Sequence, residues 1–354
     1  MTESLVISID GMGGDHGAPM TIGGVAEFAK SHPQAKFLIH GDEKQLTDLV
    51  ATHPVLKGRV KICHADKVIE MDDKPAQAVR RGKGSSMWNA IESVKNGDAN
   101  ACVSAGNTGA LMAMAKLILR TMNGVHRPAL CASWPTVSGI CCVLDLGADI
   151  TADAEQLSEF AIMGTAFARA VHHKESPSVG LLNIGSEDMK GNDTLRNAAE
   201  LISKSNLNFD FKGFVEGDDI SMGTTDVVVT DGFTGNIALK SAEGAAKLMG
   251  HFLSTSLKSS LFGLLGGLIA TPALKMVKHH MDPRQVNGAV FLGLKGMVIK
   301  SHGGTDALGF ARAIDVAAEM GAFDFAHEIE KDMKRLSATV SEFGDQLDPT
   351  EAAE

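Results

Sequence analysis

Five short glycine-containing segments hold most of the residues that could do chemistry. They are IDGMGGDHG from Ile9, SAGNTG from Ser104, NIGSEDMKG from Asn183, TDGFTG from Thr230 and SHGGTD from Ser301. Each follows a short apolar run and precedes a helical pattern. The first residues of a helix offer free N–H groups and the positive end of the helix dipole, which together bind anions. The five segments therefore predict an anionic ligand, although glycine-rich turns also occur in purely structural roles.

The first segment does not complete the dinucleotide-binding fingerprint. A G-x-G-x-x-G motif starting at Gly11 requires glycine at position 16, where the sequence has His16. The sequence also lacks the P-loop motif and the G-x-S-x-G elbow of α/β-hydrolases. Asp10, Asp15 and His16 are possible metal ligands, but polar groups in loops commonly bond to their own backbone, so we expect no metal. Five cysteines without C-x-x-C spacing also argue against a zinc site or a disulfide framework.

Alternating strand and helix patterns must position these segments. We expect strands over 5–10, 36–40, 60–64, 101–104, 139–144, 179–184, 211–216, 226–230 and 297–300, and helices including 86–95, 110–120, 155–172 and 236–253. This alternation predicts an α/β/α sandwich with a mainly parallel sheet covered on both faces. Parallel strands end at a common edge, so we expect all five segments to gather there. Two of them, 106–109 and 232–235, share the pattern Gly-x-Thr-Gly, which indicates a common turn type.

Composition narrows the class of protein. The chain has 354 residues, of which 44% are hydrophobic and 21% charged, as in an ordinary globular domain. Its net charge of −10 disfavours nucleic acid as a partner. The start, MTESLVISID, has no basic region followed by a long apolar core, so we expect no signal peptide and a cytoplasmic location. We expect one catalytic domain over 1–336 and an acidic, solvated tail over 337–354.

An uncharged apolar stretch runs from residue 261 to residue 274. It is shorter than the roughly 20 residues that span a bilayer as a helix, and Pro272 with three glycines argues against one straight core helix. The segment is either a buried helical hairpin or dimer contact, or an apolar finger that enters a membrane surface or docks a lipid-bearing partner. For the second alternative, an insertion over about 254–284 supplies these apolar and basic candidates: Leu261, Phe262, Leu264, Leu265, Leu268, Ile269, Lys258, Lys275, Lys278 and Arg284.

Several strings along the chain together carry a resemblance to a known family. They are DGMGGDH from Asp10, NTGA from Asn107, RPA from Arg127, NIGSE from Asn183, KGN from Lys190, GFVEG from Gly213, TDGFTGN from Thr230 and DALG from Asp306. In this order, over about residues 5–335, they resemble the phosphate:acyl-ACP acyltransferases, the PlsX family. Each string alone is weak, and the ordered set is specific.

The resemblance implies both a fold and an activity. The fold would be similar to that of the isocitrate and isopropylmalate dehydrogenases and of the phosphate acetyltransferases. The activity would be transfer of a long-chain acyl group from acyl-ACP to inorganic phosphate, giving acyl phosphate for phospholipid (phosphatidic acid) synthesis. The protein would be a homodimer without organic cofactor or metal. Its apolar segment would lie at an exposed tip that contacts the inner face of the cell membrane and docks acyl carrier protein, and a glycerol-3-phosphate acyltransferase would use the product.

In this reaction phosphate is the nucleophile, so the enzyme must hold a dianion beside the thioester and stabilise the oxyanion. Lys190 is the candidate for binding phosphate or the developing charge, and Asn236 for donating to the oxyanion. Asp231 would orient Lys190 or a water molecule, and His16 would protonate the leaving thiolate. Each of these residues also has an ordinary role as a solvated, turn or capping residue. Phosphate-binding candidates are Gly13, Gly14, Asn107, Thr108, Gly109, Thr234 and Gly235.

Three other functions compete with this prediction. A phosphate acetyltransferase using acetyl-CoA is the nearest, but the apolar segment disfavours so short an acyl group. A decarboxylating dehydrogenase would carry metal-binding aspartates and a nicotinamide site, and the sequence indicates neither. A non-catalytic, membrane-bound scaffold for lipid enzymes is the alternative from a different class.

Overall fold

The computed structural model describes residues 5–187, 189–280, 282–321 and 325–347; the side chains at 278–280, 283, 326, 327 and 343–347 are also outside the description. The strands are β1 (Val6–Asp10), β2 (Lys36–Gly41), β3 (Val60–His64), β4 (Ala101–Ser104), β5 (Ala129–Thr136), β6 (Gly139–Leu144), β7 (Ser178–Leu182), β8 (Asp210–Val215), β9 (Val227–Val229), β10 (Ala289–Leu292) and β11 (Met297–Lys300). The helices are α1 (Gly17–Ser31), α2 (Glu43–Ala51), α3 (Pro75–Arg81), α4 (Ser86–Lys95), α5 (Thr108–Leu119), α6 (Ala154–His172), α7 (Asp193–Lys204), α8 (Gly217–Met222), α9 (Gly232–Lys258), α10 (Leu261–His280), α11 (Ala307–Gly321) and α12 (Phe325–Leu347). Short 3-10 helices lie at Pro54–Leu56 and Pro283–Val286.

The described strands form one sheet of 11, in the order β3-β2-β1-β4-β11-β10-β5-β6-β9-β7-β8. The first five strands in this order are parallel to one another, as are the last four. The pairs β11–β10, β10–β5 and β5–β6 between them are antiparallel. Three reversals make the two parallel halves run in opposite directions, so their carboxyl ends point to opposite edges of the sheet.

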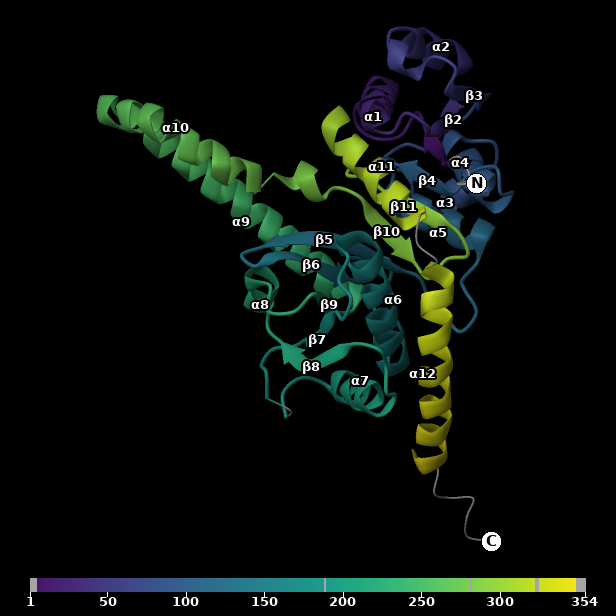
Figure 1. Cartoon of the computed structure of the whole chain (residues 1–354), viewed down its shortest axis with the longest axis vertical. Coiled ribbons are helices and arrows are strands. Elements are labelled where there is room, and N and C mark those ends of the chain that lie inside the picture. The colour runs from purple at the N-terminus through teal and green to yellow at the C-terminus, as the bar shows by residue number, and fades with distance from the viewer. Residues whose placement is uncertain (1–4, 188, 281, 322–324, 348–354) are drawn as a thin grey trace.

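Helices cover both faces of this sheet (Figure 1). On one face α1 packs against α11, and α6 packs against α7 and α12, over a core that includes Ile7, Phe160 and Phe310. On the other face α4 and α5 pack together over a second core that includes Cys102 and Val298. Alternation along each strand produces this division, because successive side chains point to opposite faces. The expected α/β/α sandwich with a mainly parallel sheet is confirmed.

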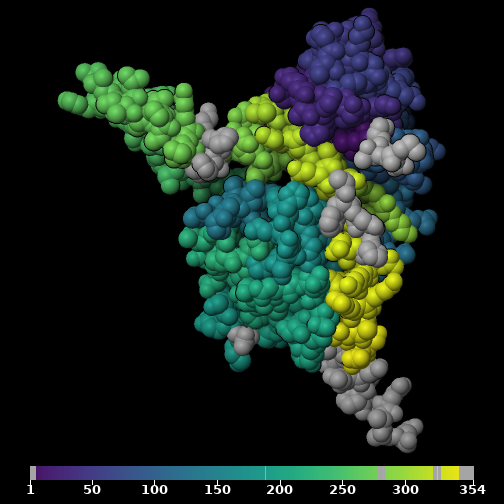
Figure 2. Space-filling view, viewed as in Figure 1, coloured from purple at the N-terminus to yellow at the C-terminus, as the bar shows by residue number. Residues whose placement is uncertain are grey.

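The pair α9–α10 projects away from the body of the molecule (Figures 1 and 2). The helices turn back on each other with a bend of 120°. Side chains near the turn are strongly exposed, with Phe262 at 86% and Ile269 at 82%. Among the described helices, none alone is long and apolar enough to cross a membrane, whereas Gly232–Lys258 and Leu261–Val277 reach that threshold only as a bent pair.

The structure differs from the sequence predictions in three places. The antiparallel strands β5 and β10 were not expected. Because of the reversals that they introduce, β7 and β9 run opposite to β1, β4 and β11, so the prediction that all five glycine segments share one edge is wrong. Pro272 lies inside α10, which is exposed and not a core helix, in line with the expectation. That helix is exposed, so the alternative of a hairpin buried within this chain is also wrong. Residues 337–347 belong to α12 and 348–354 lie outside the described residues, so the proposed domain boundaries stay a prediction.

Candidate functional site

Three of the five glycine loops meet at the carboxyl ends of β1, β4 and β11. The N–H of Asp15 donates to the carbonyl of Gly303 at 2.9 Å, which joins the first loop to the last. Gly13 lies against Gly106, since a Cβ added at Gly13 would be 2.8 Å from the Gly106 nitrogen. Only glycine allows these backbones to approach so closely. We call these loops, residues 10–17, 104–108 and 301–306, the first loop group.

A row of buried polar side chains lies beneath the first loop group. Asp10, Ser104 and Lys300 are the last residues of β1, β4 and β11. The strand register pairs Lys300 with Ser104 and places Asp10 beside Ser104 on the other side. All three residues point to the α4 and α5 face of the sheet, because Ile9, Val103 and Ile299 pack in the opposite core. The sequence predicted the ends of these three strands, but not this row.

Asp10 is 1% exposed, and its carboxyl is only partly satisfied. Its Oδ2 accepts a hydrogen bond of 2.7 Å from the Ser104 hydroxyl, which in turn accepts one of 3.0 Å from the Gly106 N–H. Its Oδ1 has no hydrogen-bond partner among the described residues. Burial raises the pKa of the Asp10 carboxyl, although the hydroxyls of Ser86 and Ser104, the backbone at Met12 and the charge of Lys300 oppose that shift.

Lys300 is 7% exposed, and its ammonium lies between two of the loops. Its Nζ donates to the carbonyl of Ala105 at 3.4 Å and to the carbonyl of Ser301. Burial lowers the pKa of Lys300 from 10.5 to about 8, against the opposing charges of Asp15 and Asp10. A buried lysine at the end of a parallel strand, beneath three glycine loops, is well placed to meet an anion.

The loops after β6 and β9 form a second loop group, residues 145–149 and 230–236, at the opposite edge. The carboxylate of Asp145 organises it, with Oδ1 accepting from the N–H groups of Leu130, Gly147 and Ala148 and Oδ2 from that of Asp149, at 2.9 to 3.1 Å. Burial raises the pKa of Asp145, and these four hydrogen bonds oppose the shift. The motif residue Arg127 forms an ion pair with Asp149 and ties β5 to this group.

Helix α9 connects the two groups. Its first residue, Gly232, packs against Asp145 and Asp149 in the second group. Lys240, two turns further and about 12 Å along the axis, acts electrostatically on Lys300 and His302 in the first group. Burial lowers the pKa of His302, while Glu243 opposes that shift and Lys300 and Lys240 reinforce it. The start of α9 therefore lies between the two edges that carry the predicted site residues.

Among the predicted phosphate-binding residues, Gly13, Gly14, Asn107, Thr108 and Gly109 belong to the first loop group or directly follow it. Asn107 caps α5, accepting from the Ala110 N–H at 2.9 Å. Its amide donates to the carbonyls of Met71 and Asp73 at 2.8 and 2.9 Å, so its donors are used within the protein. Thr108 is exposed and available to a ligand.

The remaining predicted residues lie in or near the second loop group. Thr234 and Gly235 open α9, and the carboxylate of Asp231 caps it by accepting from the N–H and hydroxyl of Thr234, each at 2.8 Å. Asn236 is exposed beside Gly147. Lys190 is exposed in the loop after β7, which adjoins β9. His16 is exposed at the start of α1 in the first group, without a side-chain capping bond. The structure therefore divides the predicted catalytic set between the two groups.

Within the described part of the chain, one set of side chains has the spacing of metal ligands: His126, Glu155 and Glu159. The buried Glu159 carboxylate accepts from both the ring and the backbone N–H of His126, the latter at 3.0 Å. Its hydrogen-bonding needs are therefore met without an ion. The hydrogen bond with Glu159 raises the pKa of His126, as expected for an ion pair.

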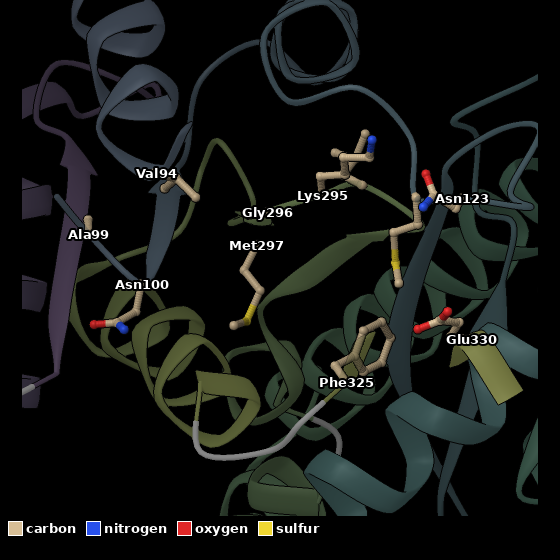
Figure 3. A pocket seen from close by; sticks show the side chains of 11 residues that line it. Val94, Ala99, Asn100, Asn123, Lys295, Gly296, Met297, Phe325 and Glu330 are labelled. Atoms are coloured by element: carbon tan, nitrogen blue, oxygen red, sulfur yellow. The ribbon is translucent and has the colours of Figure 1, made fainter. Parts of the chain in front are cut away.

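A cavity of about 600 Å³ lies away from both loop groups (Figure 3). Ala99 and Asn100 precede β4 and Met297 begins β11, so the cavity is at the amino ends of these strands. Figure 3 shows Asn100 and Asn123 on opposite sides of it and Phe325 at its border. A smaller cavity of about 300 Å³ lies beside α3. Neither cavity contains a predicted site residue.

The predicted docking residues lie on or next to the projecting pair. Leu261, Phe262, Leu264, Leu265, Leu268 and Ile269 are all exposed on α10. Lys258 ends α9 and Lys275 is exposed on α10, whereas the side chain of Lys278 lies outside the described residues. Arg284 forms ion pairs with Asp282 and Asp306 at 2.5 and 2.8 Å, so much of its charge is already neutralised.

Comparison with known proteins places this architecture among acyltransferases. A family described as "Fatty acid synthesis protein" matches residues 5–328. The phosphate acyltransferase of Caulobacter vibrioides is 53% identical over 356 residues, covering 100% of this chain and 99% of that protein. The phosphate acyltransferase of Parvibaculum lavamentivorans is 52% identical, covering 100% and 98%. A phosphotransacetylase structure from Streptococcus pyogenes superposes with a TM-score of 0.62 and 16% identity, covering 91% of this chain and 95% of that one, a likeness of fold alone.

Proposed function

This chain belongs to the phosphate acyltransferase family, and we propose that it transfers a long-chain fatty acyl group from acyl carrier protein to inorganic phosphate. The observation that carries the phosphate part is the first loop group, where three glycine loops converge over the buried cation of Lys300. The observation that supports a lipid-bearing donor is the exposed apolar face of α10. A short acyl group on a soluble carrier would have no use for that face.

In the proposed reaction an oxygen of hydrogen phosphate attacks the thioester carbonyl. The C–O bond forms, the C–S bond breaks, and the thiolate takes up a proton equivalent to the one that the phosphate group loses. Acyl phosphate and free thiol result. Phosphate is already nucleophilic near neutral pH, so the enzyme contributes orientation and stabilisation of the oxyanion rather than a nucleophile of its own.

We assign the two tasks to the two ends of the site. Backbone N–H groups of the first loop group, at Gly13 and Gly14, would bind phosphate. Asn236 and Lys190, exposed on the second half of the sheet, would stabilise the oxyanion and the developing charge. His16 would donate a proton to the thiolate. Asp231 serves as a helix cap, and its proposed role in orienting Lys190 is a separate, testable claim.

One assay tests this function against its rivals. The protein is mixed with palmitoyl-ACP and phosphate, and acyl phosphate and free carrier thiol are measured. We expect both products in equal amounts, no effect of added NAD, and far slower reaction with acetyl-CoA. No product with palmitoyl-ACP would favour the scaffold alternative, and preference for acetyl-CoA would favour a phosphate acetyltransferase.

Lys190→Ala and Asn236→Ala test the assignment of the oxyanion site. Each should lower turnover about 10²-fold or more, in line with the loss of one preorganised donor, without changing the melting temperature. Lys212→Ala is the matched control, because Lys212 is an exposed lysine paired with Asp210 on β8. Full activity in either variant would remove that residue from the mechanism.

We further propose that the protein is a cytoplasmic homodimer whose α9–α10 pairs contact the inner face of the cell membrane. There the product would pass to a glycerol-3-phosphate acyltransferase for phosphatidic acid synthesis. Leu264→Glu with Leu268→Glu should abolish binding to liposomes in a flotation assay. The control is Leu117→Glu with Val137→Glu, which changes one leucine and one valine that are exposed elsewhere on the protein and should leave liposome binding unchanged. Equal flotation of the two double variants would disprove the membrane contact.

The acidic carrier protein would dock on the basic residues around the turn, chiefly Lys258 and Lys275, with Arg284 contributing less because of its ion pairs. Such a contact weakens as salt screens the charges. The Michaelis constant for palmitoyl-ACP should therefore rise with ionic strength, and Lys258→Glu with Lys275→Glu should raise it at low salt. A salt-independent constant would contradict this docking surface.

A further inference from the structure

Lys300 buries a positive charge without a negative partner. It is 7% exposed, and no carboxylate in the described residues lies within 4.0 Å of its Nζ, whose contacts are the carbonyls of Ala105 and Ser301. Buried charges are almost always paired, because an unpaired one loses its hydration without compensation. The two carbonyl contacts use two of the three ammonium donors. The arrangement is therefore incomplete within the protein alone.

A second observation at the same place also points to a ligand. Asp10, beneath the same loops and 1% exposed, has an Oδ1 without a hydrogen-bond partner. The hydroxyl of Ser86, a buried residue of the neighbouring helix α4, lies beside the same carboxyl and also makes no hydrogen bond of good geometry among the described residues. The Ser86 hydroxyl can donate to an anion, as can the third ammonium donor. Unsatisfied donors thus gather where three glycine loops present their backbones.

We propose that Lys300 is the counter-ion of the phosphate substrate, its ammonium pairing with the dianion seated between the loops after β1, β4 and β11. This inference rests on the proposed function for the identity of the anion. It names a binding residue that the sequence motifs did not indicate, and it places phosphate in the first loop group rather than the second. Lys190 would then stabilise the negative charge that develops at the thioester carbonyl.

The charges around Lys300 determine how its proton responds to the ligand. Asp10 on β1 and Asp15 in the following loop favour its charged form, and Lys240 on α9 disfavours it; His302 is also close, with Glu243 beyond it. With these groups alone, burial lowers the pKa of Lys300 to about 8. A dianion in contact with the ammonium would raise that pKa again. Binding should therefore be accompanied by proton uptake where free Lys300 is partly deprotonated.

Isothermal titration in buffers of different ionisation enthalpy measures this uptake directly. The probes are inorganic phosphate and sulfate, the latter because it stays a dianion over the whole pH range and contributes no protons of its own. With the wild-type chain we expect an uptake of about half a proton per sulfate at pH 8, rising at pH 9, and little at pH 6.5. With phosphate, we expect the same proton uptake by the protein, in addition to any protons that phosphate itself gains or loses on binding.

Two substitutions separate pairing with the anion from a purely structural role. Lys300→Arg keeps a permanent charge, so it should bind either anion without the excess proton uptake. Lys300→Met keeps the length without the charge and should weaken binding about tenfold or more. Lys295→Met is the control, because Lys295 is an exposed lysine just before β11 at the opposite edge, and it should change neither affinity nor uptake.

Lys300 could instead act only as a clamp between the carbonyls of two loops. In that case the anion would cause no proton uptake, and Lys300→Met would lower the melting temperature while leaving the affinity of the folded protein unchanged. Either result would overturn the proposal. The arginine variant keeps the test valid if the methionine variant does not fold. These measurements use no acyl donor, so failure of acyl transfer from palmitoyl-ACP would refute the proposed function and leave this result standing.

Discussion

The loops after β4 and β9 share the sequence Gly-x-Thr-Gly, but the expected common turn type is wrong, because the cap of α5 lies inside the first motif and the cap of α9 precedes the second. The polar groups beneath the two loops also differ. Both loops open a helix and both have a capping side chain, Asn107 for α5 and Asp231 for α9. Below the first, Asp10 and Lys300 are buried without full partners. Below the second, the Asp145 carboxylate accepts four backbone N–H groups. The same four-residue sequence thus lies over incompletely hydrogen-bonded groups in one half of the sheet and over a carboxylate with four hydrogen bonds in the other.

The shared sequence alone therefore decides neither the turn nor whether the loop binds a ligand. A carboxylate whose acceptor positions are filled by the backbone holds its loop in one conformation. An unpaired ammonium and an unpaired carboxyl oxygen leave free energy to be gained by a ligand. We therefore regard the second loop group as a rigid support that holds Asn236 in place, and the first as the anion site. Four experiments on stability, affinity and turnover test that division.

Asp145→Ala should be the most damaging change, because it leaves four N–H groups without an acceptor, two of them buried and two partly buried. At about 1–3 kcal/mol for each unsatisfied group, with some relaxation and entry of water, we expect a loss of roughly 4 kcal/mol or more in the free energy of unfolding. Chemical denaturation measures it. Asp145→Asn keeps the oxygen that accepts three of the four bonds and should lose less than half as much. Equal losses would show that the charge, not the acceptors, supports the loop.

Lys300 should make the stability of the free protein depend on pH in the alkaline range. Its pKa is about 8 in the folded chain against an ordinary 10.5, so between these values the unfolded chain binds more protons. Stability then rises with pH across this window, by about 3 kcal/mol in total. Denaturation of the wild-type chain and of Lys300→Met, in phosphate-free buffer at pH 7.5 to 10.5, measures the difference in slope. Identical pH profiles would mean that the ammonium is not buried unpaired.

The sequence predicts the strands that carry Asp10, Ser104 and Lys300, but not how these strands lie beside one another. The apolar runs that end at Asp10, Ser104 and Lys300 were predicted as strands with those ends, and the structure confirms them. Their alignment in one row depends on the order β1-β4-β11, which is set by packing between distant segments. The four apolar residues of β10 have no pattern that separates a strand from a loop or short helix. Without β10 and β5, the reversal between the halves of the sheet could not be anticipated.

The predicted site shows the same limit. The glycine turns were found from local spacing, because turns are local structures. Asp145 and Lys300 were missed because their roles arise from burial and from distant partners, such as the N–H of Leu130 and the carbonyl of Ala105. For Lys300, the available signal was a lysine at the end of an apolar strand, directly before Ser-His-Gly-Gly. Its burial was not visible in the sequence.

Gly13→Ala should damage the first loop group specifically. The added methyl would lie 2.7 Å from the Asp10 carboxylate and 2.8 Å from the Gly106 nitrogen. We expect a loss of about 2 kcal/mol in stability from the forced shift, with a larger proportional loss of phosphate affinity. Gly217→Ala is the control, because no atom lies within 4 Å of the position of its added methyl. Unchanged phosphate affinity in a folded Gly13→Ala variant would move the anion site away from this loop.

Asp231→Ala should have the smallest effect, and it decides what the loop after β9 does. If Asp231 only caps α9, the change removes one acceptor for the Thr234 N–H and costs about 1 kcal/mol, and Asp231→Asn costs less because asparagine caps nearly as well. Turnover would then be unchanged in both variants at a temperature where they are folded. If Asp231 instead orients Lys190, turnover falls in both variants while stability falls only in the first, because asparagine replaces the cap but not the charge. The second result would add Asp231 to the reacting groups beside Asn236, and the second loop group could then no longer be regarded mainly as a support.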